Sequence, residues 1–199
     1  MTETLVPTTE LQAVNNMLAS IGESPVSTLD TGTVVDADLA QTLLFNVNRQ
    51  VQALGLHCNS EVDYPLSPNE DGEIILPANT LRVDEVYGAS SRDLTQRGSR
   101  LYDRNNRTFV IDESVTLDIV MMLPFDELPE AVRWYIAVKA SRIFVDKTMG
   151  DEALHAYSRQ DEMEAKRDFV KSQLKNRDAS MLNSTFARSI TGRQRVTRR

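Results

Sequence analysis

The sequence has little cysteine and histidine and no long apolar run, and each shortage excludes a class of protein. Cys58 is the only cysteine among 199 residues, so no internal disulfide framework can form. With His57 and His155 as the only histidines, no ligand spacing indicates a zinc site. No apolar run approaches the ~18 residues of a membrane span, and the first residues lack the basic start and apolar stretch of a signal peptide. We therefore expect a soluble protein of a reducing cytoplasm that binds no metal and no cofactor.

Catalytic signatures are also missing. The sequence has no glycine-rich phosphate loop, no nucleophile elbow and no metalloprotease helix motif. His57 and Cys58 are adjacent, and adjacent side chains rarely face each other as a base and a nucleophile must. Acidic residues are plentiful, but nothing singles out two that lie the ~5–9 Å apart that a glycosidase requires. The sequence therefore predicts no catalytic residue.

Charge is unevenly distributed along the chain. The net charge is −7, yet residues 184–199 carry five arginines and no acid. The other 183 residues carry 17 basic and 29 acidic side chains, a balance of −12. Because duplex DNA presents one negative charge per ~1.7 Å, an acidic body argues against general DNA binding. Only the basic end is suited to an anionic partner.

Apolar side chains at helical spacing predict four helices, interrupted by a region without that period. Thr9 and Gln12 fit a capping box at the start of the first helix, and Gly22 supplies a left-handed stop. The third helix is apolar on two faces, which is typical of a helix covered on both sides. The predicted helices span residues 9–21, 34–54, 129–148 and 151–176. We expect the core to include Leu18, Val47, Val51, Trp134, Ile136, Ala140 and Ile143.

Residues 60–124 contain prolines, glycines and short alternating runs that predict strands. The strand candidates are Glu73–Leu76, Leu81–Tyr87, Thr108–Ile111 and Val115–Leu123, with a hairpin link at 112–114. The predicted class is α+β, a helical bundle domain with an inserted small antiparallel β-sheet and a C-terminal basic tail. The helical domain comprises residues 1–59 and 125–178, the inserted β region 60–124 and the flexible Arg-rich tail 179–199.

Two basic segments are candidate binding regions. The first contains Arg92, Arg97, Arg100, Arg104 and Arg107, which form either a solvated hairpin surface or a contact with a partner protein or with DNA. The second is the C-terminal tail, which is either a solubilising end or a segment that becomes ordered on a partner. Apolar side chains interleaved with its arginines favour the second interpretation, because a purely solvating tail needs no such anchors. The residues expected to dock are Leu182, Phe186, Arg188, Ile190, Arg193, Arg195, Arg198 and Arg199.

Three segments carry a specific family resemblance. They are Leu11–Leu29 (LQAVNNMLASIGESPVSTL), Asn48–Gly55 (NRQVQALG) and Leu128–Arg142 (LPEAVRWYIAVKASR). Together they resemble tail tubular protein A of short-tailed phages, or podoviruses, over about residues 11–58 and 124–183. The strand region resembles that family only in outline.

The resemblance implies a structural protein of the virion tail that is made and assembled in the cytoplasm of the bacterial host. Twelve copies would form an adaptor, or gatekeeper, ring between the capsid portal and the tail nozzle. The partners implied are further copies of the chain, the portal protein and the nozzle protein (tail tubular protein B), with tail fibres as a further candidate. DNA would pass through the ring without specific binding.

Two other classes remain as alternatives to this head-to-tail connector. A virion-associated enzyme that cleaves polysaccharide or peptidoglycan would need a concave site with convergent carboxylates. A DNA-binding regulator would need a basic face on its folded body, which the balance of −12 opposes.

Overall fold

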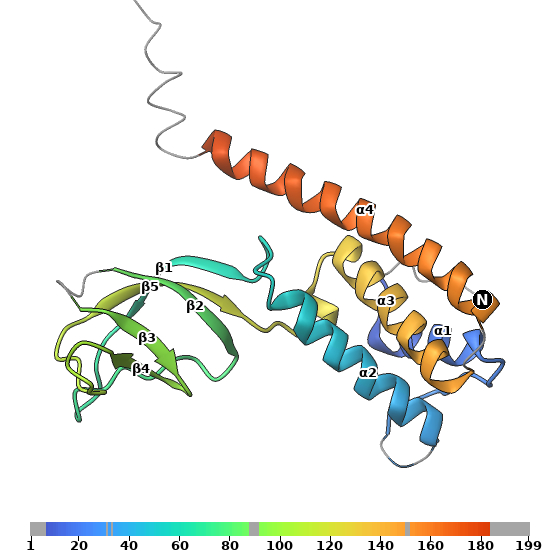
Figure 1. The fold of residues 1–199 in the computed structure, drawn as a ribbon, viewed down its shortest axis with the longest axis horizontal. Helices are drawn as coiled ribbons and strands as arrows, with labels where there is room; N and C mark the ends of the chain where they lie inside the picture. Colours follow the sequence, from blue (N-terminus) through green and yellow to red (C-terminus); the bar gives the residue numbers. More distant parts are fainter. Residues whose placement is uncertain (1–6, 31, 33, 88–91, 150–151, 184–199) are drawn as a thin grey trace, which may run out of the picture.

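The computed structural model describes residues 7–30, 32, 34–87, 92–149 and 152–183, and these residues form an α+β protein. Figure 1 shows a lobe of helices beside a lobe of strands, with the chain passing from the first to the second and back. The helices are α1 (Glu10–Ser20), α2 (Val35–Gln52), the short 3-10 helix η1 (Phe125–Glu127), α3 (Glu130–Thr148) and α4 (Glu152–Asn183). The strands are β1 (Ser60–Leu66), β2 (Thr80–Tyr87), β3 (Leu94–Arg97), β4 (Arg100–Asp103) and β5 (Val115–Met121).

The four α-helices lie close to their predicted ranges, and the predicted capping box is present. The Thr9 hydroxyl accepts a hydrogen bond from the Gln12 amide at 3.2 Å, and the Gln12 side chain accepts one from the Thr9 amide at 3.1 Å. The largest difference is at the end of α4, which continues past residue 176 to Asn183. Residues 177–183 lose the apolar period but contain no glycine or proline, and a helix ends at such breakers more readily than at a loss of amphipathicity.

The core of the helical lobe lies where α1, α2 and α3 meet. It is centred on Leu18, Val47, Val51, Ile136 and Ala140, which are all buried as the sequence predicts. The prediction that Trp134 is buried is wrong, because this side chain is 48% exposed. Ile143 is only partly buried against the same core.

The error at Trp134 has a physical cause in the packing of α3. One apolar stripe of α3 is covered by α1 and α2, and α4 packs along the other. Ala165 and Phe169 of α4 reach the core, but apart from Ala165 the residues of α4 that line the groove at Trp134 are the charged Asp161, Glu164 and Asp168. The second stripe of α3 is therefore incompletely covered, and the indole lies at the edge of a groove.

The β lobe contains two small antiparallel sheets. In the first, β5 lies between β1 and β2, and in the second β3 pairs with β4 as a hairpin. The predicted strands at 73–76 and 108–111 are wrong, because these segments make only isolated bridges. The residues at 112–114 do not close a hairpin either, since β5 pairs with strands farther away in the sequence. A second cluster of buried side chains fills this lobe: Ile74, Leu76, Leu101, Ile111, Val115, Leu117 and Ile119.

Buried side-chain amides connect the two lobes. The Gln52 carboxamide, at the end of α2, donates to the Leu123 carbonyl at 2.8 Å and accepts from the Leu123 amide at 2.8 Å. Asn59 donates to the Met121 carbonyl at 2.7 Å and to the Gln52 carbonyl at 3.0 Å. Both side chains are almost completely buried, so the entry to the strands and the exit from them are held together at one point.

Candidate functional site

Most of the predicted docking tail lies outside the described residues. Phe186, Arg188, Ile190, Arg193, Arg195, Arg198 and Arg199 all follow the last residue of α4. Leu182 belongs to α4, not to a separate segment. The prediction that these residues dock on a partner therefore stays a prediction.

The arginines of the β lobe make contacts within the chain. The Arg100 guanidinium pairs with Glu73 at 2.6 Å and lies 4.1 Å from the centre of the Phe109 ring. Arg97 lies in the same way 3.6 Å from the centre of the Tyr102 ring. Arg100 therefore connects β4 to Glu73 and to the loop that follows the hairpin, whereas the contact of Arg97 with Tyr102 lies within the β3–β4 hairpin.

Two further arginines pair with carboxylates of the same lobe. Arg92 lies 3.4 Å from Glu113 and 3.9 Å from Asp103, and Arg104 lies 3.3 Å from Asp93. Much of the local positive charge is therefore compensated inside the chain. A contact of Arg92, Arg97, Arg100, Arg104 and Arg107 with a partner or with DNA stays a prediction.

The long helix α4 offers more surface than the rest of the helical lobe covers. Its 32 residues span about 48 Å, and in Figure 1 its C-terminal end extends well past the start of α3. The two helices run antiparallel, with Tyr135 stacked on Phe169 at 4.8 Å between ring centres. At the other end of the contact Arg142 pairs with Glu162, and it also binds Asp146 at 2.8 Å.

This ion cluster is partly shielded from water. Burial by itself would lower the pKa of Arg142, but the hydrogen bond and charge of Glu162, with the charge of Asp146, raise it above its ordinary value. Burial also raises the pKa of Tyr135, and the negative charge of Glu162 adds to that effect. Arg142 therefore stays charged and fixes α4 on α3.

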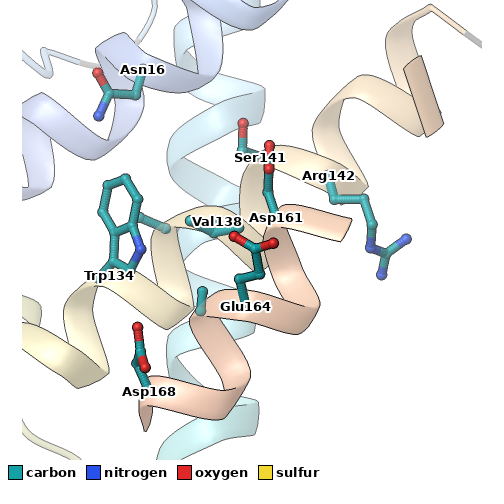
Figure 2. A pocket seen from close by; sticks show the side chains of 10 residues that line it. Asn16, Trp134, Val138, Ser141, Arg142, Asp161, Glu164 and Asp168 are labelled. Carbon is teal, nitrogen blue, oxygen red and sulfur yellow. The ribbon is translucent and has the colours of Figure 1, made fainter. Parts of the chain in front are cut away.

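One side of α4 borders a groove of about 550 Å³ against α3. Asp161, Glu164 and Asp168 line it from α4, and we call these three residues the acidic flank. Figure 2 shows their carboxylates along one wall, the Trp134 indole on the other, and the Arg142 guanidinium turned away. The groove thus combines an exposed aromatic ring with three carboxylates, of which only Asp168 has a cationic partner among the described ion pairs, the exposed Lys171.

The opposite side of α4 has a different character. Met163, Val170 and Leu174 are 51%, 42% and 54% exposed, although each is apolar. Lys166, Arg167 and Lys171 lie among them, and we call these six residues the apolar–basic face.

This face continues onto the junction of the two lobes. A second hollow, of about 540 Å³, is lined by Val170 and Leu174 together with Leu54 and Val62. Leu54 is 63% exposed and Val62 is 70% exposed. Contiguous apolar side chains at this degree of exposure are typical of interaction surfaces.

The acidic flank does not have the arrangement of carboxylates that paired acid catalysis uses. The three carboxylates of the acidic flank project from a single helix into open solvent, whereas paired acid catalysis needs carboxylates on both sides of a substrate. Within the described part of the chain, no three His, Cys, Asp or Glu side chains are grouped to hold a metal ion. Burial raises the pKa of the Cys58 thiol, which disfavours the reactive thiolate.

None of the helices that the structure describes has the length and hydropathy needed to cross a bilayer.

Buried polar residues were the main features that the sequence patterns did not reveal. Arg133 donates to the backbone carbonyls of Thr8 and Leu128, at 3.0 and 2.5 Å, and to that of Asp126. Asp103 has a fully buried side chain that accepts from the Asn105 and Asn106 amides at 2.9 and 3.0 Å.

Sequence patterns mark such residues only weakly. The available signals are an arginine in an apolar stripe and an Asp with Asn two and three residues later, and both also occur on solvated surfaces.

Comparison with known proteins places the chain in a family. A family model described as tail tubular protein matches residues 11–179. The chain is also 31% identical, over 182 residues, to tail tubular protein A of Klebsiella phage KP34. That alignment covers 91% of this chain and 95% of the phage KP34 protein. The chain therefore belongs to the tail tubular protein family and is a structural protein of a phage tail.

Proposed function

We propose that this chain is an adaptor protein of the phage tail. In this proposal twelve copies form a ring between the capsid portal and the nozzle protein, tail tubular protein B. The observation that carries it is α4, which exposes an acidic flank on one side and an apolar–basic face on the other. The described part of a single copy leaves both surfaces exposed, and a protein that works within an assembly has neighbours to cover them.

The charge of the body suits a channel through which DNA passes. A wall lined with lysines and arginines would retain the phosphate backbone, whereas a neutral or acidic wall lets it move. The balance of −12 over residues 1–183 supports the second arrangement. The proposed channel therefore guides DNA during ejection and does not bind it specifically.

The C-terminal end is the proposed contact with the portal. Leu182, Phe186 and Ile190 recur every four residues, which places them on one side if the helix continues. Arg188, Arg193, Arg195, Arg198 and Arg199 then pair with carboxylates of the portal and orient the encounter. Such a short segment has little apolar area of its own, so it becomes ordered on the partner.

The proposal includes no catalytic step. The acidic flank lies in an open groove, on one helix, without a second carboxylate facing it among the groove residues described. The protein is assembled in the host cytoplasm and functions in the virion tail. Tail fibres are a candidate contact at the outer surface of the ring.

Reconstitution with purified portal rings tests the proposal. The chain is mixed with portal of the same phage, and the complexes are separated by sedimentation and imaged by electron microscopy. We expect a second ring stacked on one end of the portal, and we expect nozzle protein to bind only after that ring has formed. Nozzle protein that binds bare portal equally well would contradict the adaptor role.

A further inference from the structure

We propose that the two sides of α4 are complementary halves of one interface, so that the apolar–basic face of one copy occupies the acidic groove of the next. This inference rests on the proposed ring and specifies how neighbouring copies recognise each other. It starts from the three apolar side chains Met163, Val170 and Leu174, which the described part of the chain leaves about half exposed.

The two surfaces point away from each other. Successive residues of an α-helix are turned by about 100°, which centres the acidic flank about 120° from the apolar–basic face. The side of α4 between them that faces inward carries Ala165 and Phe169, which are buried in the core. Each copy therefore has two separate surfaces on one rigid element, as a head-to-tail contact requires.

The two surfaces are complementary in charge, and both include apolar side chains. The groove offers three carboxylates and the half-exposed Trp134 ring, and the face offers three cations among its apolar side chains. Within one copy the charges meet only once, at the exposed Lys171–Asp168 pair, 3.3 Å apart. A pair this exposed contributes little, so both residues remain available to a neighbour.

The distribution of charge also favours a head-to-tail contact between copies over a two-fold dimer. In a two-fold dimer each surface would meet itself, which would place carboxylates against carboxylates or cations against cations. Only the acidic groove of one copy against the apolar–basic face of another pairs opposite signs. A contact between two different surfaces propagates from copy to copy and closes into a ring when the rotation allows it.

Trp134 reports on this contact directly. It is the only tryptophan of the chain, and its indole lies in the groove. Covering it with a neighbour removes water from the ring, so its fluorescence emission shifts to the blue on assembly. The change in emission therefore reports on the groove and on no other part of the molecule.

The experiment uses two charge-reversed versions of the full chain. The first carries Asp161→Lys, Glu164→Lys and Asp168→Lys, and the second carries Lys166→Glu, Arg167→Glu and Lys171→Glu. A control carries the same number of reversals on the exposed acidic side chains Glu61, Glu70 and Asp71 of the β lobe, each changed to Lys. Assembly is measured by mass photometry and Trp134 emission, with and without portal rings.

Each charge-reversed version by itself should need at least about tenfold more protein to assemble than the wild type, because like charges now face each other. An equimolar mixture should recover wild-type assembly and the blue shift, since every contact in an alternating ring again joins opposite signs. This recovery also demonstrates that both versions are folded. The control should assemble like the wild type.

The outcomes separate the inference from the proposed function. Rings formed by either reversed version alone, or a mixture that stays dispersed while the wild type assembles, would overturn the inference and leave the adaptor ring intact. A wild-type chain that stays monomeric even with portal present would overturn both.

Discussion

The side-chain amide of Gln52 pairs with the backbone of Leu123 as a strand residue would, through two hydrogen bonds of 2.8 Å. These residues are 71 positions apart, and they stand on either side of the whole β lobe. The Asn59 side chain adds bonds to both of the segments that Gln52 connects. The orientation of the β lobe on the helical lobe therefore depends on a few buried amides as well as on apolar contact.

Replacing Gln52 with leucine should destabilise the protein by about 1–3 kcal/mol, because the Leu123 amide and carbonyl lose their partner without gaining water. The free energy of unfolding in urea measures this change. Gln50→Leu is the matched control, since Gln50 lies on the exposed side of the same helix and should change stability by less than about 0.5 kcal/mol. Equal effects at the two positions would contradict the structural role of Gln52.

Replacing Trp134 with alanine should cost only about 1 kcal/mol in the free subunit, because nearly half of this side chain is already in water. Phe144→Ala on the same helix should cost about 3–5 kcal/mol, because Phe144 is fully buried. Thermal unfolding of the two variants, compared under conditions where the chain is monomeric, makes the measurement. A loss of stability at Trp134 as large as that at Phe144 would show that the indole is enclosed.

The β lobe should lose stability in acid through Asp103. Hydrogen bonds from the Asn106 amide and side chain and from the Asn105 amide, with the charge of Arg92, hold the pKa of Asp103 below its ordinary value. A carboxylate with a lowered pKa stabilises the fold above its unfolded pKa of about 3.9, and that contribution disappears as the pH falls through the folded pKa.

The melting temperature should therefore fall between pH 5 and pH 3, and Asp103→Asn should remove part of that dependence while lowering the melting temperature at pH 7. Asp112→Asn, at an exposed position of the same lobe, is the control and should leave both nearly unchanged. An unaltered pH profile in Asp103→Asn would refute the assignment.

Removing residues 184–199 tests the docking tail. A chain that ends at Asn183 keeps all of α4 and should melt at nearly the same temperature as the full chain, yet it should fail to join portal rings. A chain with the five tail arginines changed to glutamine should bind portal more weakly and with less dependence on salt. Portal binding by the shortened chain at full strength would reduce the tail to a solubilising end.

The helices were predictable from local signals. These signals are the capping box at Thr9, the periodic apolar positions of α2 and the breaker at Gly22. Each depends only on residues that are close together in the sequence, so it can be recognised without knowing the fold. Of the strands, β5 was the clearest because its buried residues alternate along most of its length.

The remaining strands depend on partners that are distant in sequence. β1 contains Pro65 and has a register shift between Glu61 and Tyr64, so its pairing with β5 leaves no alternating pattern to recognise. β3 and β4 are only 4 residues long each, which is too short for an alternating pattern to stand out, and they pair through backbone bonds.

The candidate surfaces were even harder to predict from the sequence than the strands. Met163 and Val170 are seven residues apart on α4 and so share one side of it, but whether they face the core or the solvent depends on where α3 lies. The same applies to Trp134, whose stripe on α3 is complete in sequence and only partly covered in space. Residues 184–199 were singled out by their arginines and by the spacing of their apolar residues, and their docking on a partner stays a prediction.

The central claim is that this chain forms the ring between portal and nozzle, and cryo-electron microscopy of the virion tail tests it most directly. The account predicts a ring of twelve copies at that junction, with the C-terminal end of each chain directed at the portal and the two sides of α4 covered by neighbouring copies. Density for this chain located only at the tail tip or in the fibres, or a portal that contacts the nozzle without it, would contradict the account.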